Sequence, residues 1–296
     1  MLIFNLPEYK KLAQEIARGK SEKIKRGGFE KRIFPNGESQ LILKSKVAGE
    51  NCAILGGISA PNELIDLLFL SDLLKKDGAK KVIAVVPYFS LSRQDKSEPD
   101  KSWGMKSLSN IFLSSKFDNI ISLDLHNEYG RKMFKNKLVS IETVQLFADQ
   151  IRKICLQDYC VIAPDEGAKA RAGKLAELLR CRQFGYFKKV RTNNYTKHLK
   201  YHGDIEKIAV IYDDILDTGA TLISAVKELR RLGFDEIYIF VTHGQFTGAK
   251  WKQLSKFGVK AIYATNSIPK KTTSKLIKEL SAAGLIKKYL LSSPRK

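Results

Sequence analysis

Short apolar runs rich in Val, Ile and Leu alternate along this chain with segments of helical periodicity. In the first half, the pattern predicts strands over 52–57, 81–89 and 119–126 and an amphipathic helix over 61–78. The second half repeats the alternation, with strands predicted over 160–167, 208–215 and 236–244 and helices over 143–154, 168–180 and 219–233. Alternation of this kind is typical of βαβ units, in which helices cover a mainly parallel sheet. The pattern therefore predicts an α/β protein.

The repetition predicts two doubly wound domains. A chain of 296 residues is long enough for each half to bury a core of its own. Because the helix over 143–154 opens the second alternation, the expected domains are residues 1–142 and residues 143–296.

Composition narrows the class of protein. Hydrophobic residues make up 44% of the chain and charged residues 28%, which excludes disordered and collagen-like chains. No apolar window is long enough to span a membrane, and Glu8 and Lys10 interrupt the apolar start, so we expect neither a membrane partner nor a secretory signal. The four cysteines are too scattered for a zinc ribbon or a redox pair. These features predict a cytoplasmic protein with reduced thiols.

The charge balance favours an anionic ligand. Lys and Arg number 52 against 31 Asp and Glu, a formal net charge of +21. The composition argues against a nucleic-acid partner, because most of these charges are lysines spread over the whole chain, whereas recognition of bases and phosphates leans on Arg. A positive field of this size accelerates the arrival of a polyanionic small molecule.

Polar side chains follow five of the predicted strands, at the sheet edge where ligands of open parallel sheets gather. They are Arg93, Gln94, Asp95, His126, Asp165, Glu166, Asp213, Asp214, Asp217, Thr242 and His243.

The segment 208–221 is the most informative part of the chain. An apolar strand runs into Asp213 and Asp214, which suit the two hydroxyls of a vicinal diol, such as the 2- and 3-hydroxyls of ribose. Asp217, Thr218, Gly219, Ala220 and Thr221 then open a helix. Unpaired N–H groups at a helix start, together with hydroxyl donors, suit a phosphate monoester. The alternative, an ordinary helix cap, accounts for one of these residues but not for the whole set. The loop therefore predicts a sugar phosphate, and we call residues 213–221 the ribose-phosphate loop.

This loop resembles the phosphoribosyl-diphosphate binding loop of phosphoribosyltransferases and of ribose-phosphate pyrophosphokinases. Further matches to the pyrophosphokinase pattern extend from about residue 12 to about residue 291. They are FPNGE (34–38), PYFSLSRQDK (87–96), SLDLH (122–126), APDEGAKARA (163–172), THGQFTG (242–248) and TNSIP (265–269). The resemblance implies two phosphoribosyltransferase-like domains. It also implies transfer of the diphosphoryl group of ATP to the 1-hydroxyl of ribose 5-phosphate.

The resemblance also assigns residues. His126 and Asp165 match metal positions, for Mg²⁺. The ATP positions are Phe34, Asn36, Glu38, Arg93 and Gln94. Lys189 and Arg191 match the family's catalytic pair, with Lys188 as the alternative cation. They lie in the segment 187–204, which is polar and has no periodic face. We expect this segment to be a flexible lid. In this family the turn at 34–38 serves the neighbouring subunit, so a homo-oligomer is implied.

Three departures from the family pattern leave alternatives open. Asn36 stands where Asp is usual, and Ala168 and Ala220 replace glycines. An alanine there crowds the backbone if the position needs positive φ. A catalytically silent partner of a true synthetase is therefore the second reading. A phosphoribosyltransferase, which has no need of FPNGE, SRQDK or the lid, is the third, and nucleic-acid binding is the fourth.

Overall fold

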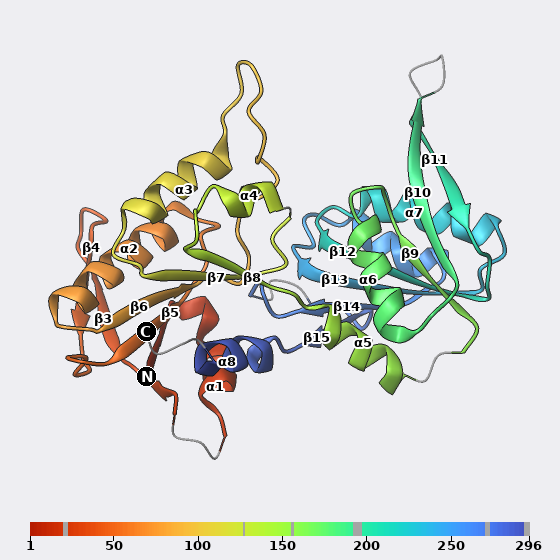
Figure 1. The fold of residues 1–296 in the computed structure, drawn as a ribbon. Coiled ribbons are helices and arrows are strands. Elements are labelled where there is room, and N and C mark those ends of the chain that lie inside the picture. Colours follow the sequence, from red (N-terminus) through yellow and green to blue (C-terminus); the bar gives the residue numbers. More distant parts are fainter. Residues whose placement is uncertain (20–22, 127, 155–156, 192–196, 270–272, 293–296) are drawn as a thin grey trace. The chain divides into compact units, whose positions relative to one another are not determined.

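The computed structural model describes residues 1–19, 23–126, 128–154, 157–191, 197–269 and 273–292. The chain divides into two compact units (Figure 1). Unit 1 consists of Met1–Ile141 together with Ala282–Lys296, and unit 2 is Glu142–Ser281. Within the described ranges, no helix is both long enough and apolar enough to cross a membrane.

Unit 1 is built on a sheet of six parallel strands in the order β2-β1-β5-β6-β7-β8. The strands are β1 (Leu2–Asn5), β2 (Lys25–Arg26), β5 (Asn51–Leu55), β6 (Lys81–Val85), β7 (Asn119–Leu123) and β8 (Leu138–Ile141). A separate antiparallel hairpin is formed by β3 (Phe29–Ile33) and β4 (Ser39–Leu43). A short 3-10 helix, η1 (Pro7–Tyr9), follows β1.

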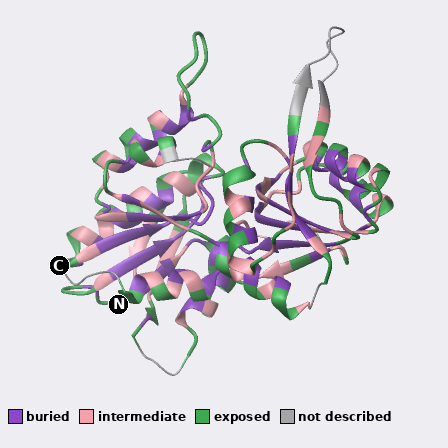
Figure 2. Cartoon of the chain, turned by 45° about the vertical axis from the view of Figure 1, so that its right-hand side comes forward, coloured by how far each residue is buried: buried purple, intermediate pink, exposed green. Residues whose placement is uncertain are grey.

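Helices cover both faces of this sheet. Their bounds are α1 (Lys10–Ala17), α2 (Pro61–Lys76), α3 (Gly104–Ser114), α4 (Glu128–Lys132) and α8 (Ala283–Ser292). Successive strand residues point to opposite faces, and accordingly Cys52 packs with α2 and α3 in one core cluster while Ala53 packs with α1 and α8 in another. Figure 2 shows the central strands mainly as buried and much of the outer helix surface as exposed.

Unit 2 has a seven-stranded sheet in the order β11-β10-β9-β12-β13-β14-β15, parallel except for the β10–β11 pair. The strands are β9 (Tyr159–Ala163), β10 (Phe184–Arg191), β11 (Lys197–Gly203), β12 (Ile208–Leu216), β13 (Glu236–Gly244), β14 (Val259–Thr265) and β15 (Ile277–Leu280). The helices are α5 (Val144–Lys153), α6 (Lys169–Leu179), α7 (Ala220–Arg231) and the 3-10 helix η2 (Lys250–Phe257).

The second sheet is also covered on both faces. Cys160 of β9 packs with α7 and η2, whereas its neighbour Val161 packs with α5 and α6. Two faces buried along parallel strands account for the continuous apolar runs in the sequence. The prediction of an α/β protein with mainly parallel sheets is confirmed.

The end of the chain differs from the expected division at residue 143. The last helix, α8, belongs to unit 1, because Ile286 and Leu290 are buried in the same core cluster as Leu12 and Ile16 of α1. Burial of these side chains against a sheet of the first half, which no local pattern specifies, brings the C-terminal segment back.

The segment 187–204, expected to be a flexible lid without a periodic face, contains regular strands instead. β10 and β11 form an antiparallel ladder, and β10 continues beyond its last pairing with β9 at Tyr186 (Figure 1). The physical reason is a packed pair of rings: Phe187 is fully buried, and its ring centroid lies 5.3 Å from that of Tyr201 on the opposite strand. Residues 192–196 of the expected lid lie outside the described residues.

Candidate active site

The ribose-phosphate loop joins β12 to α7 in unit 2. β12 ends at Leu216, and Gly219 has φ +83° immediately before the first residue of α7. A Cβ on Gly219 would lie 2.9 Å from Cβ and 3.0 Å from Cα of Trp251. Glycine is therefore needed both for its backbone conformation and for this close approach. The first N–H groups of α7 have no partner within the helix, so the loop presents donors where the sequence predicts a phosphate.

Asp213 and Asp214 lie near the end of β12, where Asp213 is partly buried and Asp214 is buried. Asp214 is 5% exposed and forms an ion pair with Arg171 of α6, at 3.3 Å between Nη1 and Oδ2. Burial, together with the neighbouring Asp214 carboxylate, raises the pKa of Asp213 well above its usual range. Arg171 opposes this shift and Asp165 adds to it, so the ends of β9 and β12 bring three carboxylates and one guanidinium into electrostatic contact.

The loop after β9 places Asp165 beside this pair. Asp165 Oδ1 accepts a hydrogen bond from the backbone N–H of Ala168 at 3.1 Å, which fixes the carboxylate at the start of α6. Ala168 is buried with φ −83° and ψ −8°, and Ala220 is not among the described residues with positive φ. Neither alanine therefore has the positive φ at which replacing a glycine with alanine would strain the backbone.

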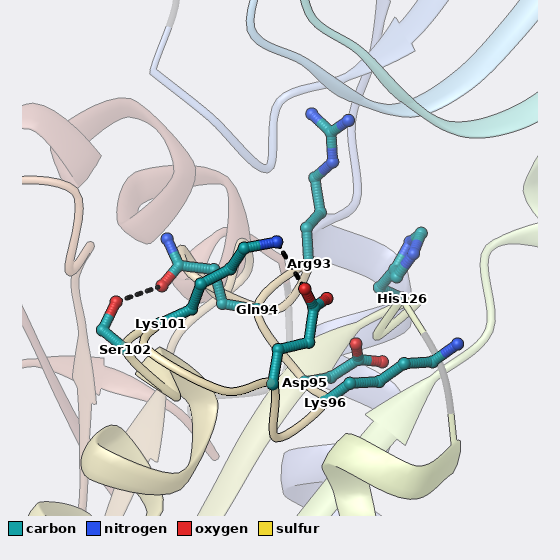
Figure 3. Close-up of a pocket in the computed structure, with 8 residues that line it drawn as sticks. Arg93, Gln94, Asp95, Lys96, Lys101, Ser102 and His126 are labelled. Atoms are coloured by element: carbon teal, nitrogen blue, oxygen red, sulfur yellow. Dashed lines mark hydrogen bonds and ion pairs between the residues drawn. The ribbon is translucent and has the colours of Figure 1, made fainter.

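Arg93, Gln94 and His126 line one pocket of about 570 Å³ in unit 1. They come from the segments after β6 and β7, as the sequence predicted for strand ends. Figure 3 shows Gln94, Lys101 and Ser102 on one side of the pocket in this view and His126 on the other. Ser102 Oγ donates to Gln94 Oε1 at 3.4 Å. Guanidinium, imidazole and lysine ammonium groups in one pocket suit a polyphosphate.

Asp95 lines the same pocket and is a functional candidate that the sequence assigned no role. It is 4% exposed, and its Oδ2 atom has no hydrogen-bond partner among the described residues. A buried carboxylate oxygen without a partner is costly, so this atom marks a position where a bound group would find an acceptor.

Phe34, Asn36 and Glu38 lie on the exposed turn of the β3–β4 hairpin, where Phe34 is 44% exposed. Asn36 Oδ1 accepts a hydrogen bond from the Glu38 N–H at 3.1 Å, so part of its acceptor capacity is used inside the turn. None of the three lines the pocket that holds Arg93. The structure therefore does not bring the five expected ATP residues together within one pocket of unit 1.

The expected catalytic pair lies on β10, where the backbone of Lys189 pairs with Leu199 and that of Arg191 with Lys197. The side chains of Lys189 and Arg191 lie outside the described residues. Lys188, the alternative cation, is 3.9 Å from Glu166, and both side chains are more than half exposed, which makes a weak pair.

The residues expected to bind magnesium fall in different units, His126 in unit 1 and Asp165 in unit 2. Across the described ranges, no group of three or more His, Cys, Asp or Glu side chains forms a ready-made metal site. Carboxylate oxygens are nevertheless the ligands that Mg²⁺ prefers. Asp165 offers such an oxygen, so its donor chemistry fits this cation.

Arg171 and Trp251 were not identified from the sequence. Arg171 lies three residues after Ala168, on a helix whose sequence is that of an ordinary amphipathic segment. Its ion-pair partner Asp214 is 43 residues further along the chain. Trp251 lies in η2, and only the tertiary structure brings it to Gly219. No local signal distinguishes either residue from a surface or core residue.

The fold and the site together define a protein with phosphoribosyltransferase-like units. It has two mainly parallel sheets, each covered on both faces, and in one of them a strand carries a carboxylate pair shortly before a glycine-opened helix. The N-terminal domain of ribose phosphate pyrophosphokinase matches residues 1–115, and the phosphoribosyl synthetase-associated domain matches residues 192–288. A ribose-phosphate pyrophosphokinase of Staphylococcus epidermidis is 30% identical over 98% of this chain and 93% of its own length. One from Bacillus cereus is 29% identical over 96% and 91%. The chain belongs to the ribose-phosphate pyrophosphokinase family.

A solved structure agrees with this fold. The crystal structure of a phosphoribosylpyrophosphate synthetase from Mycobacterium smegmatis superimposes with a TM-score of 0.88, covering 99% of both chains at 24% identity. At that identity the likeness concerns the fold alone.

Proposed function

We propose how the residues of this chain carry out the reaction of its family, the transfer of the diphosphoryl group of ATP to the 1-hydroxyl of ribose 5-phosphate. In that reaction the hydroxyl oxygen loses its proton to water and forms a bond to the β-phosphorus. The bond from that phosphorus to the oxygen of the α-phosphate breaks, and AMP leaves with that oxygen. Catalysis of such a transfer consists mainly of positioning and of neutralising phosphate charge.

The ribose-phosphate loop binds ribose 5-phosphate in this proposal. Asp213 and Asp214 accept hydrogen bonds from the 2- and 3-hydroxyls, and Asp217, Thr218, Gly219, Ala220 and Thr221 surround the 5-phosphate at the start of α7. The single observation that carries the proposal is the join between β12 and α7, where two adjacent carboxylates lie within the last four residues of the strand and Gly219 turns the backbone into a helix start. A phosphate alone does not account for the carboxylates, whereas a phosphorylated diol accounts for both groups.

ATP binds at the pocket of unit 1. Arg93 contacts the phosphates and Gln94 contacts the nucleotide. His126 would hold the magnesium ion that accompanies ATP. Asp165 of unit 2 is the second magnesium position. When bound, Mg²⁺ supplies positive charge to the phosphate oxygens. Lys189 and Arg191 on the β10–β11 hairpin neutralise the charge that develops on the transferred group.

A second copy of the chain completes the ATP site in this proposal. The turn with Phe34, Asn36 and Glu38 is exposed and separate from the Arg93 pocket. Apolar side chains beside it are exposed as well, namely Ile33 (70%), Ile65 (43%) and Phe69 (47%). A neighbouring subunit that covers them also places Phe34 against the adenine of its partner's ATP. The cytoplasmic location expected from the sequence stays a prediction.

The test is formation of AMP by the purified protein from ATP and Mg²⁺, with and without ribose 5-phosphate. We expect AMP only when the sugar phosphate is present. AMP formed equally in its absence would indicate another reaction of ATP and contradict the proposal. A folded protein that binds ATP without forming AMP would instead support the second reading of the sequence, a catalytically silent partner of a true synthetase.

A further inference from the structure

The turn that follows β13 lies against the ribose-phosphate loop. We call residues 245–248 the supporting turn. The backbone N–H groups of Gln245 and Phe246 both donate to the carbonyl oxygen of Leu216, at 2.9 and 3.2 Å, and the N–H of Thr247 donates to the carbonyl of Asp217 at 3.2 Å. Three consecutive donors thus fix the two carbonyls that precede the start of α7.

Trp251 holds the supporting turn from the other side. It is 1% exposed, and its indole Nε1 donates to the carbonyl oxygens of Phe246 at 3.2 Å and Gly248 at 3.1 Å. Its ring also packs against that of Phe246, with 4.9 Å between centroids. Because its Cα and Cβ are the atoms nearest to Gly219, Trp251 contacts both the turn and the loop.

The supporting turn adopts a conformation that needs outside support. Phe246 has φ +52°, in the left-handed region that aromatic residues rarely occupy. A Cβ on Gly244 would meet the Phe246 ring at 2.3 Å, so the ring folds back over the end of β13. Strained backbone persists only where its surroundings fix it, and the indole hydrogen bonds of Trp251 are such a constraint.

The strand end before the turn is fixed by a buried polar network. Ser267 Oγ donates to the carbonyl of Thr242 at 2.9 Å and lies 2.9 Å from His243 Nδ1. Thr265 Oγ1 donates to the same Thr242 carbonyl at 2.6 Å. These bonds anchor the end of β13, where the supporting turn begins. The other end of the turn is held by the indole hydrogen bonds of Trp251.

We propose that Trp251 is a positioning residue for ribose 5-phosphate, which acts through the supporting turn. The inference rests on the proposed function of the ribose-phosphate loop. The indole N–H fixes residues 246–248, and these fix the carbonyls of Leu216 and Asp217. The N–H groups at the start of α7 are then held in place before the phosphate arrives. Preorganised donors bind more tightly, because no ordering remains to be done on binding.

Trp251→Phe tests the inference, since it keeps an aromatic ring beside Phe246 and Gly219 but removes the N–H. We expect ribose 5-phosphate to bind about tenfold more weakly in calorimetry, with ATP affinity unchanged. The unfolding temperature should fall, because two carbonyls lose their donor and a smaller ring leaves space at a buried position. Trp103→Phe is the matched control: its indole Nε1 also donates to a backbone carbonyl, that of Asp95 at 3.0 Å, but in unit 1. Its ribose 5-phosphate affinity should equal that of the wild type.

Two results would overturn the inference, and a third would overturn the proposed function. Equal ribose 5-phosphate binding by Trp251→Phe and wild type overturns the inference. Equal weakening of both substrates also overturns it, because it indicates a purely structural role. Failure of the wild type to bind ribose 5-phosphate overturns the proposed function instead.

A second measurement does not depend on folding of the Trp251→Phe variant. The chain has two tryptophans, so Trp103→Phe leaves Trp251 as the sole indole emitter. Because the inference holds the indole fixed before binding, its emission maximum should stay the same at saturation with ribose 5-phosphate. A shift that indicates rearrangement of the indole on binding contradicts the inference.

Discussion

Gly219→Ala probes the join of β12 and α7 most directly. At φ +83° an alanine costs about 1–2 kcal/mol relative to glycine. Its Cβ would also lie 2.9 and 3.0 Å from Trp251, closer than van der Waals contact and in part against backbone. Overpacking of this kind costs about 1–3 kcal/mol. We therefore expect Gly219→Ala to lower the free energy of unfolding by about 2–5 kcal/mol.

Gly233→Ala is the matched control. Gly233 also has positive φ, +99°, but an added Cβ there meets nothing within 4 Å. It follows α7 at the opposite end of the helix from the ribose-phosphate loop. This variant should lose only the conformational part, about 1–2 kcal/mol. The difference between the two variants therefore measures the contact with Trp251.

The assay is urea unfolding followed by circular dichroism, combined with the KM for ribose 5-phosphate. We expect a lower unfolding midpoint for Gly219→Ala than for Gly233→Ala. The KM should rise in Gly219→Ala alone, because the displaced backbone carries the phosphate donors. Equal midpoints, or an unchanged KM in Gly219→Ala, would refute the reasoning.

Three further predictions concern charged residues. Lys189→Ala should lower turnover by orders of magnitude and leave the unfolding temperature unchanged; AMP formation at the wild-type rate would remove its catalytic role. Arg171→Met leaves the Asp214 carboxylate, 5% exposed, without its guanidinium partner and should cost about 2–3 kcal/mol of stability, allowing for the partial exposure of Arg171. That loss should shrink in an Asp214→Asn background, and an equal loss there would exclude the coupling. The raised pKa of Asp213 stabilises the folded state in full below the unfolded value of about 3.9, and this effect is lost as pH rises through the folded value. In buffer with EDTA, Asp213→Asn should therefore be more stable than the wild type near neutral pH and gain nothing in acid. A constant difference across this pH range would contradict the burial argument.

Local pattern predicted much of the fold. The predicted strand over 236–244 agrees with β13, and the helix over 61–78 agrees with α2 to within two residues. These elements were predictable because buried parallel strands and amphipathic helices carry their burial in their own sequence. The short edge strands β2 and β15 and the β10–β11 hairpin were not predicted, since their stability comes from pairing with partners rather than from apolar periodicity.

The sequence by itself determined the two α/β alternations and the order of polar residues after the strands, and with them the ribose-phosphate loop. Each of these is written within a few consecutive residues. Only the tertiary structure decided that Arg171 pairs with Asp214, that Trp251 lies against Gly219, and that α8 returns to unit 1. Contacts between distant positions depend on how whole elements pack, and no local spacing encodes which side chains then meet.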